Sequence, residues 1–137
     1  MKISIIPYTH IDAIWDSVKD MIAGACFYTN GRYTSDDVLS LLQENKLMLW
    51  IAFDDAMDIH GVSVTCITHY PSKRALTSVF VGGTNAKIWL GIMANVLIKW
   101  AKDNDCDCLE GTGRSGWMKI IPSLGLKKMQ TQFEKDI

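Results

Sequence analysis

The stretch from residue 75 to residue 102 constrains the fold more than any other part of the sequence. Residues 75–81 are largely apolar or β-branched and predict a strand, which ends at Gly82–Gly83. A long helix is then predicted from about Asn85 to Lys102, apolar on nearly all sides. A helix of this kind has to be buried against a sheet, which predicts an α/β protein. The apolar residues of the helix are Ile88, Trp89, Leu90, Ile92, Met93, Val96, Leu97, Ile98 and Trp100.

Length and composition limit the class of protein. The 137 residues suit one domain spanning 1–137, because domains typically hold about 100–150 residues. Hydrophobic residues make up 48% of the chain, which excludes a disordered protein. A net charge of −1 argues against a general nucleic-acid partner. No apolar stretch approaches the ~20 residues that span a bilayer, and the apolar start is shorter than the signal-peptide core of about 7–15 residues. We therefore expect no membrane partner.

Cysteine and charge distribution add two weaker expectations. The four cysteines form no Cys-x-x-Cys pair, so a reduced, cytoplasmic protein is expected. Residues 1–68 hold four Lys/Arg and nine Asp/Glu, a net −5, whereas residues 69–137 hold ten and six, a net +4. An anionic ligand is therefore expected to prefer the second half of the chain.

The remaining elements are predicted from apolar periodicity and from turn residues. Thr34 or Ser35 can cap the second helix, with Asp36 and Asp37 near its positive end. The predicted order is β-α-α-β-β-β-α-β-α-β, which implies a mixed β-sheet with helices on both faces. Besides the strand and helix above, it consists of strands at 3–6, 47–53, 62–69, 108–110 and 129–134, and of helices at about 11–27, from 35 to about 44, and at 115–123.

This order resembles the GNAT N-acetyltransferase superfamily over nearly the whole chain. The resemblance rests on the strand–Gly82–Gly83–helix junction, the short strand at 108–110, Leu124–Gly125–Leu126 at the end of the last helix, and a closing strand with Glu134 near its end. It implies an acetyl-CoA-dependent N-acyltransferase that acts on a small-molecule or protein amine. Acetyl-CoA would lie between the fourth and fifth strands. Its implied binding residues are Val81, Gly82, Gly83, Thr84, Asn85, Ala86, Lys87 and Arg114.

The physical basis of that junction is sound, because the start of a helix presents free N–H donors and a positive dipole end. A narrower resemblance links Gly113–Arg114–Ser115–Gly116–Trp117 to small GNAT-like proteins of tailed phages. Lys87 either contacts a phosphate or is a solvated helix residue. Arg114 either binds an anion as a guanidinium fork or belongs to an ordinary turn.

The sequence also departs from the GNAT pattern. The stretch at 82–88, which corresponds to the family's phosphate loop, lacks the basic residue at the first position and the matching second glycine. Ile121 occupies the position of the tyrosine that is the family's usual general acid. Isoleucine cannot protonate a leaving thiolate. An alternative is therefore a catalytically inactive GNAT-fold protein that acts as a binding or phage virion-associated component. A third possibility is a homodimer whose Trp-rich helices meet a partner.

Acyl transfer to an amine requires a base and a donor for the carbonyl oxygen, and the leaving thiolate requires an acid or solvent. Candidate bases are His69, Glu110 and Asp54, and Tyr70 is a candidate acid in place of the missing tyrosine. Each also has an ordinary structural interpretation, such as a loop histidine or a salt-bridged carboxylate.

The acidic run at 103–108 invites a metal hypothesis. It lacks the glycine and final Glu of a calcium loop, and it lacks two further ligands for zinc. We interpret it as a solvated loop and predict no metal. No cysteine has a neighbouring base, so no thiolate nucleophile is expected.

Overall fold

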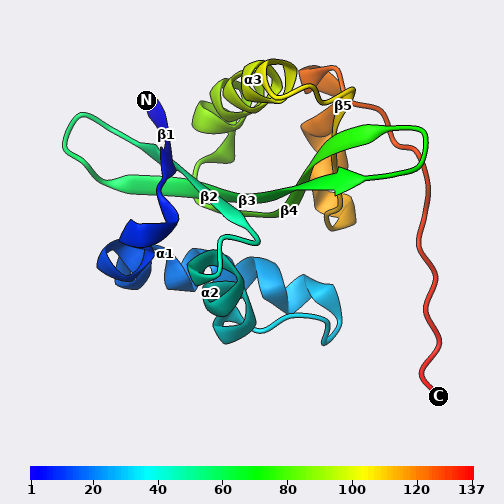
Figure 1. The fold of residues 1–137 in the computed structure, drawn as a ribbon, viewed down its shortest axis with the longest axis horizontal. Helices are drawn as coiled ribbons and strands as arrows, with labels where there is room; N and C mark the ends of the chain where they lie inside the picture. Colours follow the sequence, from blue (N-terminus) through cyan, green and yellow to red (C-terminus); the bar gives the residue numbers. More distant parts are fainter.

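A single five-stranded sheet forms the centre of the computed structural model, which describes residues 1–137 (Figure 1). The strands lie side by side in chain order. Neighbouring strands are antiparallel up to β4, and β4 and β5 are parallel because a helix connects them. The strands are β1 (Lys2–Ile6), β2 (Met48–Phe53), β3 (Ile59–His69), β4 (Arg74–Gly83) and β5 (Cys108–Gly111).

Helices α1 (Ile11–Cys26) and α2 (Ser35–Gln43) cover one face of the sheet (Figure 1). The buried stripe of α1 consists of Ile11, Val18, Ile22 and Cys26. Thr34 caps α2, as predicted: its hydroxyl accepts the Asp37 N–H at 3.2 Å, and the Asp37 carboxylate accepts the Thr34 N–H at 2.8 Å. This reciprocal capping box fixes the beginning of α2.

Helix α3 (Ala86–Asp103) covers the opposite face. Trp89 is fully buried, and its ring occupies the space that a side chain on Gly61 would fill. The Trp89 indole donates to the carbonyl oxygen of Thr84 at 2.7 Å, which ties the helix to the loop before it. Burial of Trp89 also removes it from the predicted interface of Trp-rich helices. No helix of the chain is both long enough and apolar enough to cross a bilayer.

The end of the chain differs from the prediction in two places. Instead of one helix at 115–123, the chain forms two short 3-10 helices, η3 (Ser115–Lys119) and η4 (Ile121–Leu124). Pro122 sits at the start of η4 and has no N–H to continue a longer helix. The predicted strand at 129–134 is absent, and all of its residues are exposed. Alternation alone does not make a strand when no neighbouring strand pairs with it.

Candidate functional site

The candidate site begins where β4 and β5 part, a feature we name the β4–β5 split. The pairing runs from Ala75 opposite Cys108 to Ser78 opposite Gly111. Beyond it, residues 79–83 of β4 pair with β3 on one side only. The β3–β4 register shifts at the same point, with Val79 as the extra residue of a bulge. The edge of β4 facing the split therefore presents unpaired backbone groups, which suit an extended ligand containing amides.

The loop from β4 into α3 leaves further backbone donors free. Asn85 precedes the helix in the left-handed region, at φ 55°, and no side chain caps α3. The N–H groups of Asn85, Ala86 and Lys87 have no acceptor within the chain. Thr84 differs, because its N–H donates to the carbonyl oxygen of His60 at 2.9 Å. Three of the predicted binding residues thus combine free donors with the positive end of a helix dipole.

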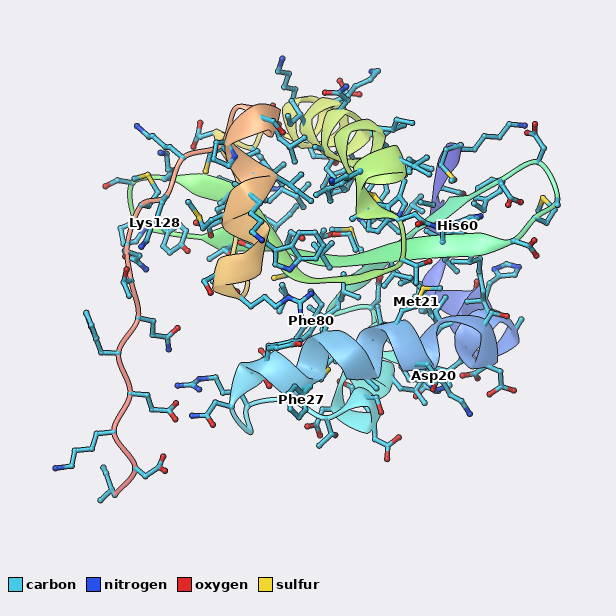
Figure 2. All side chains as sticks on the ribbon, turned by 180° about the vertical axis from the view of Figure 1, so that it is seen from behind. Asp20, Met21, Phe27, His60, Phe80 and Lys128 are labelled. Atoms are coloured by element: carbon cyan, nitrogen blue, oxygen red, sulfur yellow. The ribbon has the colours of Figure 1, made fainter.

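Lys87 is exposed and forms no ion pair, so its ammonium group is available to an anion. Gly82 and Gly83, in contrast, have packing reasons to be glycine. A Cβ on Gly82 would collide with the carbonyl oxygen of Met21, the α1 residue labelled in Figure 2. Gly83 has a φ of +131°, and a Cβ there would collide with the carbonyl oxygen of His60. The glycine pair therefore allows α1 and β3 to approach β4 closely, whether or not a phosphate binds.

Tyr70 and Glu110 come together beside the β4–β5 split. The Tyr70 hydroxyl donates to Glu110 Oε1 at 2.6 Å, and the Thr77 hydroxyl donates to the same oxygen at 2.8 Å. The hydroxyls of Thr77 and Thr68 are 2.6 Å apart, which extends this network onto β3. Glu110 lies opposite Thr77, one residue before the last β4–β5 pair. Both bonds end on Oε1, and Oε2 carries no hydrogen bond.

The hydrogen bond between Tyr70 and Glu110 changes the acidity of the Tyr70 phenol. Its hydrogen bond to the Glu110 carboxylate raises the pKa of Tyr70 above the ordinary value, with burial and nearby charge adding to the effect. A raised pKa makes the phenol a weaker acid. Of this pair, Glu110 is therefore the better candidate for proton transfer, as a base.

The other two candidate bases lie outside this network. His69 is exposed, and its Nδ1 lies 3.4 Å from Arg74 Nη1. Asp54 lies in the β2–β3 turn, at the opposite end of β3 from Tyr70. Its carboxylate is 2.7 Å from His60 Nε2 and accepts the N–H groups of Ala56 and Asp58, and these bonds lower the pKa of Asp54. Asp54 thus stabilises the β2–β3 turn through these bonds.

Arg114 contacts an aromatic side chain that the sequence analysis did not single out. Its Nη1 donates to the hydroxyl of Tyr28 at 2.5 Å, and its guanidinium carbon lies 4.5 Å from the centre of the Tyr28 ring. Tyr28 belongs to the short 3-10 helix η2 (Phe27–Thr29) after α1. Arg114 therefore links the segment after β5 to the α1–α2 connection. Tyr28 had only a weak sequence signal, namely a position just before the Asn30–Gly31 turn.

The acidic run at 103–108 is held by ordinary structural contacts. Asp103 pairs with Lys99 at 2.9 Å, and Asp107 accepts the backbone N–H of Arg74 at 2.9 Å. No three His, Cys, Asp or Glu side chains converge as a metal site requires. All four cysteines are free, and burial raises the pKa of the Cys26 thiol.

Known proteins resemble this chain in fold but not in sequence. No family model matches the sequence, and no curated protein matches it. Solved structures match along its full length. A probable acetyltransferase is 11% identical with a TM-score of 0.75, covering 100% of this chain and 98% of its own. The ribosomal-protein-alanine N-acetyltransferase of Brucella melitensis biovar Abortus 2308 is 14% identical with a TM-score of 0.73, covering 100% of both chains.

A predicted acetyltransferase with acetyl-CoA from Clostridium acetobutylicum is 12% identical with a TM-score of 0.70, covering 98% of this chain and 95% of its own. The chain therefore has the α/β fold of the GNAT acetyltransferases, as the resemblance implied. At these identities the likeness establishes the fold, and activity has to be argued from the site.

Proposed function

We propose that this protein is an acetyl-CoA-dependent N-acetyltransferase that acts on an amine of a small molecule or a protein. The observation that carries the proposal is the β4–β5 split, with an unpaired β4 edge at residues 79–83 and free N–H groups at residues 85–87. A ligand that combines an amide-bearing chain with a pyrophosphate matches these two sets of groups. Similar structures that include acetyltransferases support the same class of reaction.

Different residues of the β4–β5 split would bind different parts of acetyl-CoA. The edge of β4 from Val79 to Gly83 would hold the extended arm, and the N–H groups of Asn85, Ala86 and Lys87 would hold the pyrophosphate. The Lys87 ammonium would add a point charge. Arg114 is engaged with Tyr28, so we assign it to the wall of the site rather than to the phosphates. Bound acetyl-CoA supplies an activated acyl group.

Glu110 would accept the proton of the acceptor amine at Oε2, the oxygen that carries no hydrogen bond. Tyr70 and Thr77 hold the carboxylate in place through Oε1. Ile121 cannot supply an acid and Tyr70 is a weakened one, so the proton for the leaving thiolate would come from water. The four free cysteines support the cytoplasm as the compartment. Phage origin stays a prediction.

Calorimetric titration with acetyl-CoA tests the binding half of the proposal. We expect a dissociation constant between about 1 μM and 1 mM, in the range of ordinary enzyme substrates. Lys87→Ala should weaken binding, and Lys102→Ala at the other end of α3 should not. No heat at millimolar acetyl-CoA from a folded protein would overturn the proposal and favour the inactive binding protein.

Thiol release from acetyl-CoA in the presence of a panel of amines tests the catalytic half. Glu110→Gln should lower the rate about 10²–10⁴-fold while leaving acetyl-CoA affinity nearly unchanged. Glu44→Gln, at the exposed end of α2, is the matched control. An unchanged rate in Glu110→Gln would show that Glu110 is not the base.

A further inference from the structure

Residues 126–137, which we call the tail, run past the candidate site without joining the sheet. No backbone hydrogen bond in the chain involves a residue after Gly125. In both views the tail passes the turn between β3 and β4, which carries Tyr70, and continues towards the α1–α2 connection (Figures 1 and 2). Lys128 lies at the level of that turn in Figure 2. The tail therefore leads from the end of the sheet that holds Tyr70 and Glu110 to the α1–α2 connection.

One side chain holds the far end of the tail. An oxygen of the Glu134 carboxylate pairs with the Arg32 guanidinium, and the other oxygen accepts a hydrogen bond from the Asn30 amide. The Glu134 side chain is 32% exposed, whereas the neighbouring Phe133 is largely in solvent. No other residue of the tail forms an ion pair. The tail is thus docked on the α1–α2 connection by a single carboxylate.

Asn30 and Arg32, which we call the Asn30–Arg32 pair, are held in place by the chain around them. Arg32 Nη1 donates to the carbonyl oxygen of Thr29 at 3.0 Å, and Asn30 lies in the left-handed region at φ 53°. The Thr29 hydroxyl donates to the carbonyl oxygen of Cys26 at 2.7 Å and accepts the Tyr33 N–H at 3.2 Å. A guanidinium and an amide held in this way present one donor to each oxygen of a carboxylate.

The surroundings of the Asn30–Arg32 pair leave room for a ligand. A surface hollow of about 470 Å³ opens beside Arg32. Asp37 and Glu44 also line it, but the Thr34 N–H and the Lys46 ammonium already engage their carboxylates. Arg32 itself has no ion-pair partner other than Glu134. A carboxylate from another molecule can therefore take the place of Glu134.

We propose that the acceptor amine belongs to an extended peptide with an acidic residue, and that the carboxylate of this residue binds the Asn30–Arg32 pair. The inference rests on the proposed acetyltransferase function and names its substrate class. The tail indicates the size of the acceptor, because an extended chain from Lys128 to Glu134 spans about 20 Å. A peptide covers that distance and a small amine does not. In the free protein the tail occupies this path.

The transfer step is that of the proposed function. The amine nitrogen of the peptide forms a bond to the acetyl carbonyl carbon, and the carbon–sulfur bond of acetyl-CoA breaks. Glu110 takes the proton from the amine, and water gives a proton to the leaving thiolate. Replacement of the tail by the peptide is feasible because an ion pair between partly exposed side chains stabilises the docked tail only weakly.

Fluorescence anisotropy tests the Asn30–Arg32 pair without acetyl-CoA. The probe is a peptide with the sequence of residues 128–137, labelled at its carboxyl end. The full chain with Glu134→Gln should bind the probe about two- to tenfold more tightly than the wild type does, because its own tail competes less. Asp136→Asn removes a tail carboxylate that has no partner and should leave the affinity unchanged.

Two further substitutions make the binding test specific. Arg32→Gln in the protein should weaken binding of the probe, and so should Glu134→Gln in the probe itself. All of these protein variants should fold, since the tail contributes no secondary structure and Arg32 lies in a connection between helices. Absence of binding, equal affinity of the two probes, or equal affinity of wild type and Glu134→Gln would overturn the proposal.

Thiol release from acetyl-CoA with the unlabelled peptide tests the acceptor role. The kcat/KM of the peptide should exceed that of its Glu134→Gln form about tenfold or more, and Arg32→Gln in the protein should remove this difference. Arg32→Gln should leave the calorimetric affinity for acetyl-CoA unchanged, because Arg32 lies outside the β4–β5 split. Binding of acetyl-CoA without a preference for the acidic peptide would overturn this inference alone. No binding of acetyl-CoA would overturn the proposed function and the inference with it.

Discussion

Residues 1–111 contain every buried side chain of the protein and residues 112–137 contain none, although both regions alternate apolar and polar residues. All buried residues lie between Ile11 and Ala101, and none lies after Gly111. Val62 and Val64 of β3 alternate with polar residues in the same way as Met129 and Phe133 near the end of the chain. The first pair is fully buried between neighbouring elements and the second is exposed. Alternation therefore predicts a strand only where a partner strand and a covering layer are present.

Replacing Trp89 by alanine should break the first region most strongly, with a loss of about 3–5 kcal/mol in the free energy of unfolding. The ring is fully buried, and the substitution also removes the hydrogen bond to Thr84. Urea unfolding measures the effect. Trp117→Ala, which truncates a half-buried side chain of the otherwise exposed η3, is the matched substitution in the second region and should cost clearly less. Equal losses at the two positions would contradict the comparison.

Two glycine substitutions sharpen the account of packing around β4. Gly82→Ala should cost about 1–3 kcal/mol, because its methyl group meets the backbone oxygen of Met21, which cannot rotate away. Gly24→Ala, inside α1 with open space around it, should instead stabilise the protein by about 0.5–1 kcal/mol. Thermal unfolding of both variants shows whether each substitution lowers or raises the stability of the protein. A harmless Gly82→Ala would mean that the pair is glycine for another reason, such as ligand approach.

Loss of the α2 cap should have an intermediate effect. Thr34→Ala removes the side-chain acceptor for the Asp37 N–H and should cost about 0.5–2 kcal/mol. Ser40→Ala in the same helix is the control, since its exposed hydroxyl caps nothing. If the two variants unfolded alike, the capping box would carry no measurable stability.

The smallest expected effect is the pH response of Tyr70. Its folded pKa is raised, so the contact with Glu110 contributes stability below the unfolded pKa of about 10 and loses it as pH rises through the folded value. Glu110→Gln should lower the pKa of Tyr70 towards the ordinary value. Ultraviolet absorbance of tyrosinate follows this titration, and Tyr70→Phe identifies the residue. If the pKa of Tyr70 did not change in Glu110→Gln, the contact with Glu110 would not be the cause of the raised value.

Much of the fold was predictable because local patterns and burial agree there. The predicted strand at 75–81 and helix at 85–102 became β4 and α3 with small changes at their ends, and Thr34 caps α2 as expected. The helix at 115–123 and the strand at 129–134 were wrong, because Pro122 and the lack of a neighbouring strand override the local pattern.

The site was predictable only in part, because its contacts join distant positions. Tyr70 and Glu110 were both candidates, but their hydrogen bond spans 40 positions and no local pattern indicates it. Thr77 resembles any strand threonine. The Tyr28–Arg114 contact spans 86 positions, so its effect on Arg114 could not be foreseen.

The central claim is that acetyl-CoA occupies the β4–β5 split, and backbone amide resonances test it most directly. In a titration of isotope-labelled protein with acetyl-CoA, the account predicts the largest shifts at residues 79–83 and 85–87, with smaller ones at β1 and α2. Shifts confined to other elements, or none at millimolar acetyl-CoA, would contradict it.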